Sequence, residues 1–250
     1  MVIKKHIPNI ITLLNLFSGT IAVLLAVSDR LVEAALFVML GIFFDFFDGL
    51  AARLLKVQSE LGKELDSLAD MVTSGVVPGI VMYQLFIKAT HKNWSTFENV
   101  SVIDLEISKI HFLPFIGLLL TLAAAYRLAK FNLDTRQTTS FIGLPTPAMS
   151  LFVLSLPLIL LYHSDSWAAG IILNQYSLVF ITLLLSYLMN AEIPLFSLKF
   201  KHFSLKESWI QIAFLIISIV LLGMFRFVAI PFIILIYIVL SIFKKLMENR

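Results

Sequence analysis

Four aspartates stand at short, regular spacings in an otherwise apolar part of the sequence. Asp45 and Asp48 are three residues apart and Asp66 and Asp70 are four apart, so each pair shares one face of a helix. A polar turn at 58–64 separates the two pairs, which makes the two helices antiparallel neighbours. The sequence therefore predicts that all four carboxylates converge near one end of a helical hairpin.

A cluster of this kind predicts a site for a divalent cation. A charged Asp in the middle of a membrane helix costs about 2.5–3.5 kcal/mol, and Asp45 lies among four phenylalanines. Carboxylates held close together also repel one another, and a hard cation relieves that repulsion. All-oxygen ligands suit Mg²⁺, Mn²⁺ or Ca²⁺, whereas the chain has no Cys and no His nearby for Zn²⁺. A solvated helix end explains a single Asp equally well, but four acids at these spacings favour a metal.

The residues next to the acids suit a ligand that carries phosphate. Gly49, Ala51 and Ala52 follow the first pair, and small side chains let a ligand or another helix approach the backbone closely. Arg53 can bind a phosphate or a neighbouring carboxylate, or it can anchor the helix at the membrane surface. The hydroxyl groups that follow the last acid, at Thr73–Ser74, could line the cavity of the site or bond to their own helix backbone, and we expect the second.

Membrane helices must position these residues. Hydrophobic residues make up 59% of the 250 residues, charged residues make up 14%, and the mean hydropathy is +0.94. A soluble domain carries about 25% charged residues, and a helix of roughly 20 apolar residues spans a bilayer with its backbone satisfied. The sequence predicts an all-α, polytopic transmembrane bundle that forms one membrane-embedded domain over residues 1–250. Eight apolar stretches qualify as spans: Ile10–Val27, Leu31–Leu55, Leu65–Ile87, Ile110–Leu128, Leu144–Tyr162, Ile171–Asn190, Ser208–Met224 and Phe227–Phe243.

The distribution of basic residues predicts the orientation. With the N-terminus in the cytoplasm, 14 of the 19 Lys and Arg residues fall on the cytoplasmic side, as the positive-inside rule requires. Both termini and the turn of the acidic hairpin then face the cytoplasm, and the polar stretch Ala89–Lys109 forms an extracytoplasmic loop. No basic run resembles a nucleic-acid-binding arm, so membrane lipids are expected partners and nucleic acid is not.

The acidic hairpin resembles the signature of a known family. Eight residues across 26 positions fit the pattern D-x2-D-G-x2-A-R-x8-G-x3-D-x3-D without a departure, and this pattern is typical of the CDP-alcohol phosphatidyltransferases. The first six predicted helices are similar to the six-helix core of that family. The resemblance implies transfer of a phosphatidyl group from a CDP-linked lipid to an alcohol, release of CMP, and one or two Mg²⁺ or Mn²⁺ ions as cofactors.

The resemblance also implies roles for individual residues. Asp45, Asp48 and Asp66 are implied to bind metal, and Asp70 is implied to be the general base and to contact a second metal. The residues implied to bind the CDP-lipid come from the motif and from the start of the first helix: Asn9, Thr12, Gly49, Ala52, Arg53, Ser59 and Gly62.

Three other segments resemble the serine-transferring branch of the family. They are IPNIITLLNLFSG, YRLAKFNLDTR followed by FIGLPTPA, and EIPLFSLKFK. This resemblance implies CDP-diacylglycerol and L-serine as substrates, a homodimer, and a prokaryotic cell membrane with the active site facing the cytoplasm. The serine carboxylate needs a cation, and the candidates for acceptor binding are Arg127, Lys130, Asn132 and Arg136. Topology charges or contacts to lipid headgroups explain the same residues equally well.

Two other functions remain open from the sequence. The same chemistry could use another acceptor, namely glycerol 3-phosphate, inositol or inositol phosphate, or an archaeal CDP-linked ether lipid as donor. A cation channel or transporter would use the acids as an ion path. Such proteins spread acids along the membrane depth or repeat them in inverted halves, whereas this sequence has one group on one hairpin.

Overall fold

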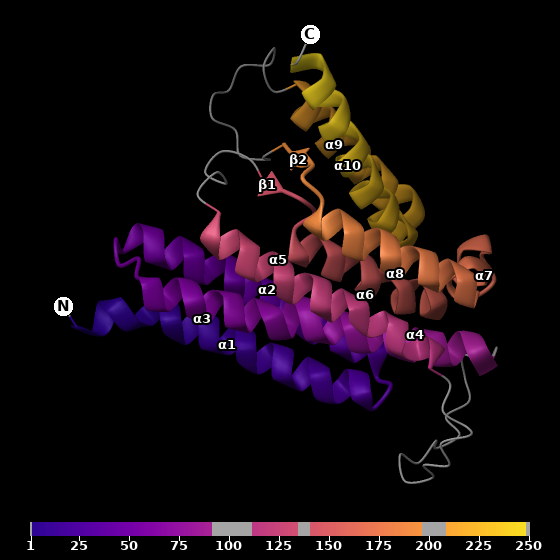
Figure 1. The fold of residues 1–250 in the computed structure, drawn as a ribbon, viewed down its shortest axis with the longest axis horizontal. Coiled ribbons are helices and arrows are strands. Elements are labelled where there is room, and N and C mark those ends of the chain that lie inside the picture. The colour runs from indigo at the N-terminus through magenta and orange to yellow at the C-terminus, as the bar shows by residue number, and fades with distance from the viewer. Residues whose placement is uncertain (1, 92–111, 135–140, 197–208, 249–250) are drawn as a thin grey trace.

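The computed structural model is built almost entirely from helices (Figure 1). Helix α1 spans Val2–Val27 and helix α2 spans Leu31–Leu54, and the two lie antiparallel and side by side. Asp29 adopts a positive φ of 57° in the short turn between them. The residues that the structure describes are 2–91, 112–134, 141–196 and 209–248.

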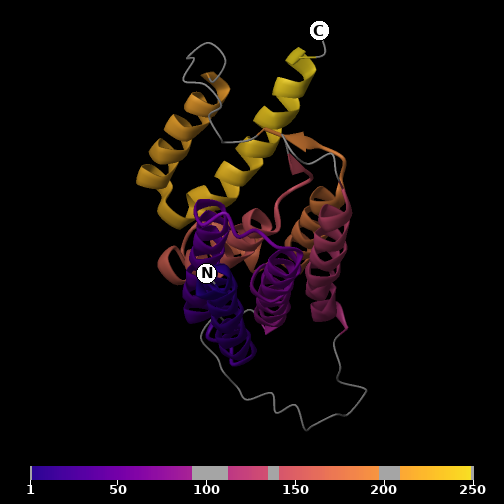
Figure 2. The same ribbon diagram turned by 90° about the vertical axis from the view of Figure 1, so that its left-hand side faces the viewer.

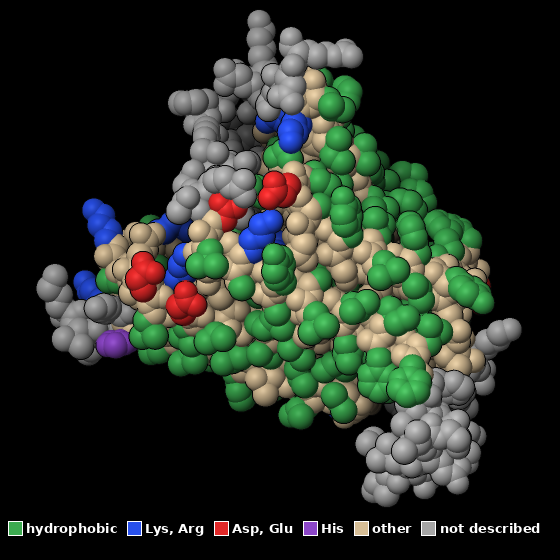
Figure 3. Space-filling model, in the orientation of Figure 1, with side chains coloured by type: hydrophobic (Ala, Val, Ile, Leu, Met, Phe, Trp, Pro, Cys, Tyr) green, Lys and Arg blue, Asp and Glu red, His purple; other side chains and the backbone are tan. Residues whose placement is uncertain are grey.

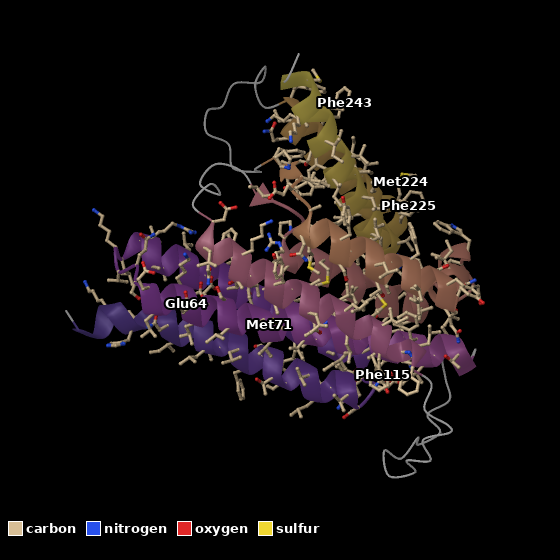
Figure 4. The ribbon with its side chains drawn as sticks, in the orientation of Figure 1. Glu64, Met71, Phe115, Met224, Phe225 and Phe243 are labelled. Carbon is tan, nitrogen blue, oxygen red and sulfur yellow. The ribbon has the colours of Figure 1, made fainter. Side chains whose placement is uncertain are left out.

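The third membrane helix is one rod made of three segments. Helix α3 (Glu60–Asp70) begins at Ser59, whose side chain accepts a hydrogen bond from the Gly62 amide at 3.1 Å. The rod continues through a π-helical segment, η1 (Met71–Val76), into α4 (Val77–His91). Figure 4 labels Met71 at the start of η1, midway along the rod. π turns within α-helices are rare and frequent at functional sites, and this one starts directly where α3 ends.

The second half of the bundle contains shorter helices. A 3-10 segment, η3 (Leu113–Leu118), leads into α5 (Leu119–Leu133). Helix α6 (Thr146–Tyr162) is buried along most of its length, and the short α7 (Trp167–Ile172) precedes α8 (Gln175–Asn190). Helices α5 and α8 pack against each other, and both contact the α3–η1–α4 rod.

The start predicted for the sixth helix, Ile171–Asn190, is wrong, because the corresponding helix α8 begins at Gln175. Its first residues belong to the end of α7 and to the turn that follows. The Asn174 side chain accepts hydrogen bonds from the amides of Tyr176 at 2.9 Å and Ser177 at 3.4 Å. An Asn in this position satisfies amides that have no partner inside the helix, so α8 begins only at Gln175.

The C-terminal helices form the predicted hairpin. Helix α9 (Trp209–Phe225) connects through the 3-10 turn η4 (Arg226–Val228) to α10 (Ala229–Glu248). Figures 1 and 2 show this hairpin leaning away from the axis that α1–α5 share. Beside it, strand β1 (Phe141–Ile142) pairs antiparallel with β2 (Pro194–Leu195). The strand pair joins the segment after α5 to the segment after α8.

The prediction of eight membrane helices is confirmed. Five segments are long and apolar enough to cross a membrane, and one of them, Trp209–Met247, contains the α9–α10 hairpin. Helices α6 and α8 are shorter apolar helices. Counting α3–η1–α4 as one rod and leaving out the six-residue α7, the described residues form eight rods. The protein is a multi-pass integral membrane protein with an all-α bundle, to which the two-residue strands are a local addition.

Charge and hydrophobicity separate along the bundle. Figure 3 shows apolar side chains over most of the flank and charged side chains gathered at one end. That end contains the N-terminal residues, the turn between α2 and α3, and the end of α5. In the predicted loop Ala89–Lys109, the first residues continue α4 to His91, and the remainder lies outside the described residues.

A buried ion pair joins the helices at the opposite end. The Lys88 ammonium on α4 binds the Asp29 carboxylate in the α1–α2 turn. Gln84 lies one turn earlier on α4, and its side-chain amide donates to the Ala26 carbonyl at 3.3 Å and the Val27 carbonyl at 3.1 Å. Burial raises the pKa of Asp29, and the neighbouring Lys88 partly opposes that rise. These contacts fix the end of α1 against α4.

Candidate active site

Three of the four predicted aspartates meet between α2 and α3. One carboxylate oxygen from each of Asp45, Asp48 and Asp66 lies within 4.8 Å of the others. The first two come from the last turns of α2, and the third comes from the middle of α3. The short connection between these helices reverses the chain at Lys56, which has a positive φ of 55°. The predicted antiparallel hairpin therefore exists and brings the acids together.

The surroundings of this triad fit a hard divalent cation. Asp48 is only 6% exposed, and its Oδ2 accepts a hydrogen bond from the Thr12 hydroxyl at 2.6 Å. Asp66 Oδ1 is buried and accepts no hydrogen bond from the described residues. A buried carboxylate oxygen without a partner is costly, and metal coordination satisfies it. The donor set is all oxygen, as Mg²⁺ and Mn²⁺ prefer, so the triad could hold one such ion.

Asp70 has a different environment from the triad. It lies one helical turn beyond Asp66 at the last position of α3. Its Oδ1 accepts a hydrogen bond from the Asn15 side-chain amide on α1 at 3.5 Å. The guanidinium of Arg127 on α5 lies near enough to attract the Asp70 carboxylate. Asp70 thus lies at the inner edge of the site, where it is hydrogen-bonded to Asn15 of α1 and faces the buried guanidinium of Arg127.

A cavity opens beside the triad at the charged end of the bundle. Its volume is about 460 Å³, and its walls come from the start of α1, the end of α2 and the start of α3. Asp48 and Asp66 form part of its wall, so the cavity and the acidic triad are one site. All seven residues predicted to bind the CDP-lipid line this cavity: Asn9, Thr12, Gly49, Ala52, Arg53, Ser59 and Gly62.

The two motif glycines, Gly49 and Gly62, leave space in the wall of the cavity because they have no side chain. A Cβ atom on Gly62 would lie 3.2 Å from Ser59 Oγ and 3.3 Å from Asn9 Oδ1. A Cβ atom on Gly49 would lie 3.4 Å from an Arg53 guanidinium nitrogen. Any larger residue would enter space next to the polar groups that line the cavity. Arg53 itself is exposed, so its guanidinium is free to meet an anionic ligand.

The described residues among the four predicted to bind the acceptor have different surroundings. Arg127 is buried, with 7% of its surface exposed, and its Nε has no hydrogen-bond partner among the described residues. Lys130 is more exposed and lies 3.5 Å from a Glu192 carboxylate oxygen. The Asn132 side-chain amide donates to Ser67 Oγ at 2.9 Å on α3. Arg136 lies outside the described residues.

The sequence analysis did not identify Asn15 as a residue of the site, and it assigned Thr73 the wrong hydrogen-bond partner. Thr73 does not bond to its own helix as expected: its hydroxyl donates to the Asn15 side-chain oxygen at 2.8 Å. Both residues have no exposed surface. The available signal was Asn15 itself, a polar residue in an apolar helix that lies one turn after Thr12 and on the same face.

The chain is similar to known proteins over most of its length. A family model described as CDP-alcohol phosphatidyltransferase matches residues 5–195, a range that ends before the α9–α10 hairpin. The chain is 34% identical over 205 residues to the CDP-diacylglycerol–serine O-phosphatidyltransferase of Bacillus subtilis, covering 80% of this chain and 92% of that protein. It is 33% identical over 148 residues to the protein of the same name from Helicobacter pylori, covering 58% and 54%. It is 27% identical over 190 residues to the archaetidylserine synthase of Methanothermobacter thermautotrophicus, covering 75% and 68%.

Proposed function

Because the chain belongs to the CDP-alcohol phosphatidyltransferase family, we propose that it transfers a phosphatidyl group from CDP-diacylglycerol to L-serine, giving phosphatidylserine and CMP. The observation that carries this proposal is the acidic triad, of which Asp48 and Asp66 line a cavity together with the motif residues Gly49, Ala52, Arg53 and Gly62. The similarity to two proteins named as serine transferases supports serine as the acceptor. All residues of the proposed site lie in one membrane-embedded domain.

The cavity suits the head of a CDP-linked lipid. Its polar wall faces the charged end of the bundle, and the helices around it have apolar outer surfaces that match acyl chains. The exposed guanidinium of Arg53 would bind a phosphate of the donor, because Arg forms strong charge-assisted hydrogen bonds with phosphate. Asp45, Asp48 and Asp66 would hold one divalent ion, with Asp70 at a second. A bound Mg²⁺ or Mn²⁺ neutralises phosphate charge and stabilises the leaving group.

Asp70 is the proposed general base. The serine hydroxyl oxygen attacks the phosphorus of the lipid phosphate, a new P–O bond forms, and the bond from this phosphorus to CMP breaks. Asp70 accepts the proton that the hydroxyl loses, which requires hydrogen-bond reach to the acceptor. Its position at the inner edge of the site, one turn from Asp66, is consistent with this role.

Arg127 is the proposed contact for the serine carboxylate. Arg127 is a buried cation near Asp70, and within the described part of the chain its Nε has no hydrogen-bond partner. A guanidinium binds a carboxylate well. Lys130 and Asn132 have partners on Glu192 and Ser67, so we propose that they support the site's edge and leave direct acceptor binding to Arg127. An acceptor carboxylate would supply a hydrogen-bond partner for Arg127 Nε, which has none among the described residues.

The proposal is tested with purified protein and a panel of acceptors. CDP-diacylglycerol is supplied with Mn²⁺ and with L-serine, glycerol 3-phosphate, inositol or inositol phosphate, and lipid products are identified by mass. A parallel series uses a CDP-linked ether lipid, since one similar protein is an archaetidylserine synthase. We expect phosphatidylserine and CMP with L-serine only. A product with another acceptor, or no metal-dependent CMP release, would overturn the proposal.

Orientation and assembly follow as parts of the proposal. We propose that the charged end of the bundle faces the cytoplasm, because basic residues of the predicted inner side lie there: Arg53, Lys56 and Lys63 in or beside the α2–α3 turn, and Lys130 near the end of α5. A prokaryotic cell membrane and a homodimer remain expectations from the family resemblance. Labelling of single cysteines introduced at Lys56 and Asp165, in a chain that has no Cys, would report which end of the bundle is accessible from outside.

A further inference from the structure

A buried polar pair lies directly behind Asp70. Asn15 on α1 and Thr73 in η1 have no exposed surface. The Thr73 hydroxyl lies 2.8 Å from Asn15 Oδ1 and 3.4 Å from the Asn15 backbone oxygen. The Asn15 Nδ2 group lies 3.5 Å from Asp70 Oδ1. Three side chains from two helices thus form a chain that ends on the carboxylate.

The direction of these hydrogen bonds fixes the Asn15 amide. A Thr hydroxyl has one proton to donate, and an amide has one oxygen that accepts and one nitrogen that donates. With its oxygen held by Thr73, the amide must point its nitrogen at Asp70. The opposite orientation would set the amide oxygen against a carboxylate oxygen, two acceptors facing each other. An ionised Asp70 carboxylate only accepts hydrogen bonds, so it selects the orientation in which Asn15 donates to it, and the Thr73 hydroxyl holds the amide oxygen in that orientation.

The local helix geometry accounts for the reach of Thr73. In a regular helix a Thr hydroxyl commonly bonds to the carbonyl four residues earlier, but Thr73 bonds across to α1. It lies in η1, the π-helical segment that begins at Met71. The wider turn of a π segment rotates the side chains that follow by up to about 100°, one residue's worth of helical turn. The π segment thus coincides with the place where the rod turns a hydroxyl toward α1.

Two glycines leave the pair little room to move. A Cβ atom on Gly19 of α1 would lie 2.3 Å from the Thr73 hydroxyl oxygen. A Cβ atom on Gly41 of α2 would lie 2.7 Å from Thr73 Cγ2 and 2.8 Å from Asn15 Oδ1. Both helices approach the pair closely because they carry no side chain there. Tight packing on three helices restricts the rotamers of Thr73 and Asn15.

We infer that Asn15, oriented by Thr73, is a positioning residue that holds the Asp70 carboxylate in the geometry that accepts the proton from the acceptor alcohol. The inference rests on the proposed function, in which Asp70 is the base. Asn15 acts through Asp70 and does not bind either substrate. Loss of the pair should therefore slow turnover without weakening substrate binding or the Mn²⁺ affinity of the triad of Asp45, Asp48 and Asp66.

The test compares kcat and KM in a set of purified variants. We expect Thr73→Val to lower kcat at least about tenfold and Asn15→Ala to lower it about a hundredfold, since small misplacements of a catalytic group cost up to this much. KM for serine and for CDP-diacylglycerol, and the affinity for Mn²⁺ measured by electron paramagnetic resonance, should each stay within about twofold. Thr73→Ser keeps the hydroxyl and should retain most of the wild-type kcat.

A matched control separates positioning from folding. Thr182 on α8 is also fully buried, but its hydroxyl bonds to the Leu178 carbonyl of its own helix at 2.8 Å. Thr182→Val should leave kcat unchanged. The inference is overturned if Thr73→Val and Asn15→Ala keep the wild-type kcat, if Thr73→Ser loses as much as Thr73→Val, or if only the KM for serine rises.

The acceptor assignment and the inference fail in different ways. If the wild-type protein turns over CDP-diacylglycerol with an alcohol other than serine, the proposed acceptor is wrong, and the same kcat series with that alcohol still tests Asn15. If the wild-type protein turns over but the variants match it, only the inference fails. A wild-type protein that releases no CMP with any acceptor overturns both.

Discussion

Asp70 is set apart from the other aspartates by its neighbours. The triad of Asp45, Asp48 and Asp66 gathers oxygen atoms around a common point, whereas Asp70 receives a hydrogen bond from Asn15 and faces the buried Arg127. A base must be close to the acceptor hydroxyl, and the residue that holds a metal must offer its oxygens to the ion. We therefore propose that the surroundings divide these tasks among four chemically identical side chains, with metal binding at the triad and base catalysis at Asp70.

Replacing Asp70 by Asn should remove turnover and spare binding. The amide has nearly the same shape but cannot take a proton at neutral pH, and general base catalysis contributes about a hundredfold or more. We expect kcat to fall at least about a hundredfold, while CDP-diacylglycerol with Mn²⁺ raises the Tm of the variant as it raises that of the wild type. CMP release at the wild-type rate would contradict the assignment of Asp70 as the base.

Removing the buried guanidinium of Arg127 should weaken the binding of serine and leave the binding of CDP-diacylglycerol unchanged. Arg127→Gln deletes the proposed partner of the serine carboxylate, and a charged hydrogen bond of this kind contributes about 1.5–3 kcal/mol. We therefore expect the KM for serine to rise about tenfold or more, with the KM for CDP-diacylglycerol nearly unchanged. Lys130→Gln is the matched control, because Lys130 is paired with Glu192 at the exposed edge. Equal effects of both variants would count against a specific role for Arg127.

At the scale of the helices, the sequence predicted the α2–α3 hairpin but not the π segment η1 or the docking of α5 on α3. The spacing of the acids and the polar turn at 58–64 predicted that α2 and α3 lie side by side, because helix periodicity alone sets which residues share a face. The π segment η1 has no such periodic signal, and neither does the contact of Thr73 with Asn15 on α1 that it accompanies. The same holds for Asn132, whose contact with Ser67 depends on how α5 docks on α3.

Gly143 offers a test of the connection between β1 and α6. It has a positive φ of 75°, and an added Cβ atom would lie 2.3 Å from the Met189 carbonyl oxygen. Gly143→Ala should destabilise the protein by at least about 1 kcal/mol, because both the backbone and the contact resist it. Gly223→Ala on α9 is the control: no atom lies within 4 Å of the added Cβ, and Ala is the better helix former. A Tm for Gly143→Ala at or above that of Gly223→Ala would refute this reading of the turn.

Across the molecule, the candidate active site and the buried Asp29–Lys88 ion pair lie at opposite ends of the bundle. The site lies where α2 ends and α3 begins, whereas the Asp29–Lys88 pair joins the α1–α2 turn to the far end of the same rod. Hydropathy predicted the number of rods, because each must cover a bilayer with apolar side chains. It could not predict the lean of the α9–α10 hairpin (Figure 2), which depends on contacts such as the Tyr237 hydroxyl with the Phe196 carbonyl at 2.8 Å.

Because the ion pair lies far from the site, replacing Lys88 should lower the stability of the protein without lowering its kcat. Lys88→Met leaves the Asp29 carboxylate buried without its cation, and breaking such a pair costs about 3–5 kcal/mol. The pKa of Asp29 should rise further, since burial then acts without Lys88 to oppose it. We expect a clearly lower Tm in detergent and a kcat near the wild-type value at a temperature where the variant is folded. A large loss of kcat in the folded variant would show that the two ends are coupled.

The account depends most on the claim that Asp45, Asp48 and Asp66 form a divalent-ion site. Its direct measurement is a Mn²⁺ titration of the purified protein followed by electron paramagnetic resonance, with Asp66→Asn and Asp165→Asn beside the wild type. Asp165 is an exposed acid between α6 and α7 and serves as the control. We predict saturable binding to the wild type and to Asp165→Asn, and an affinity at least about tenfold weaker in Asp66→Asn, as expected when a ligand is lost. Equal Mn²⁺ binding by all three proteins, or none by the wild type, would contradict the account.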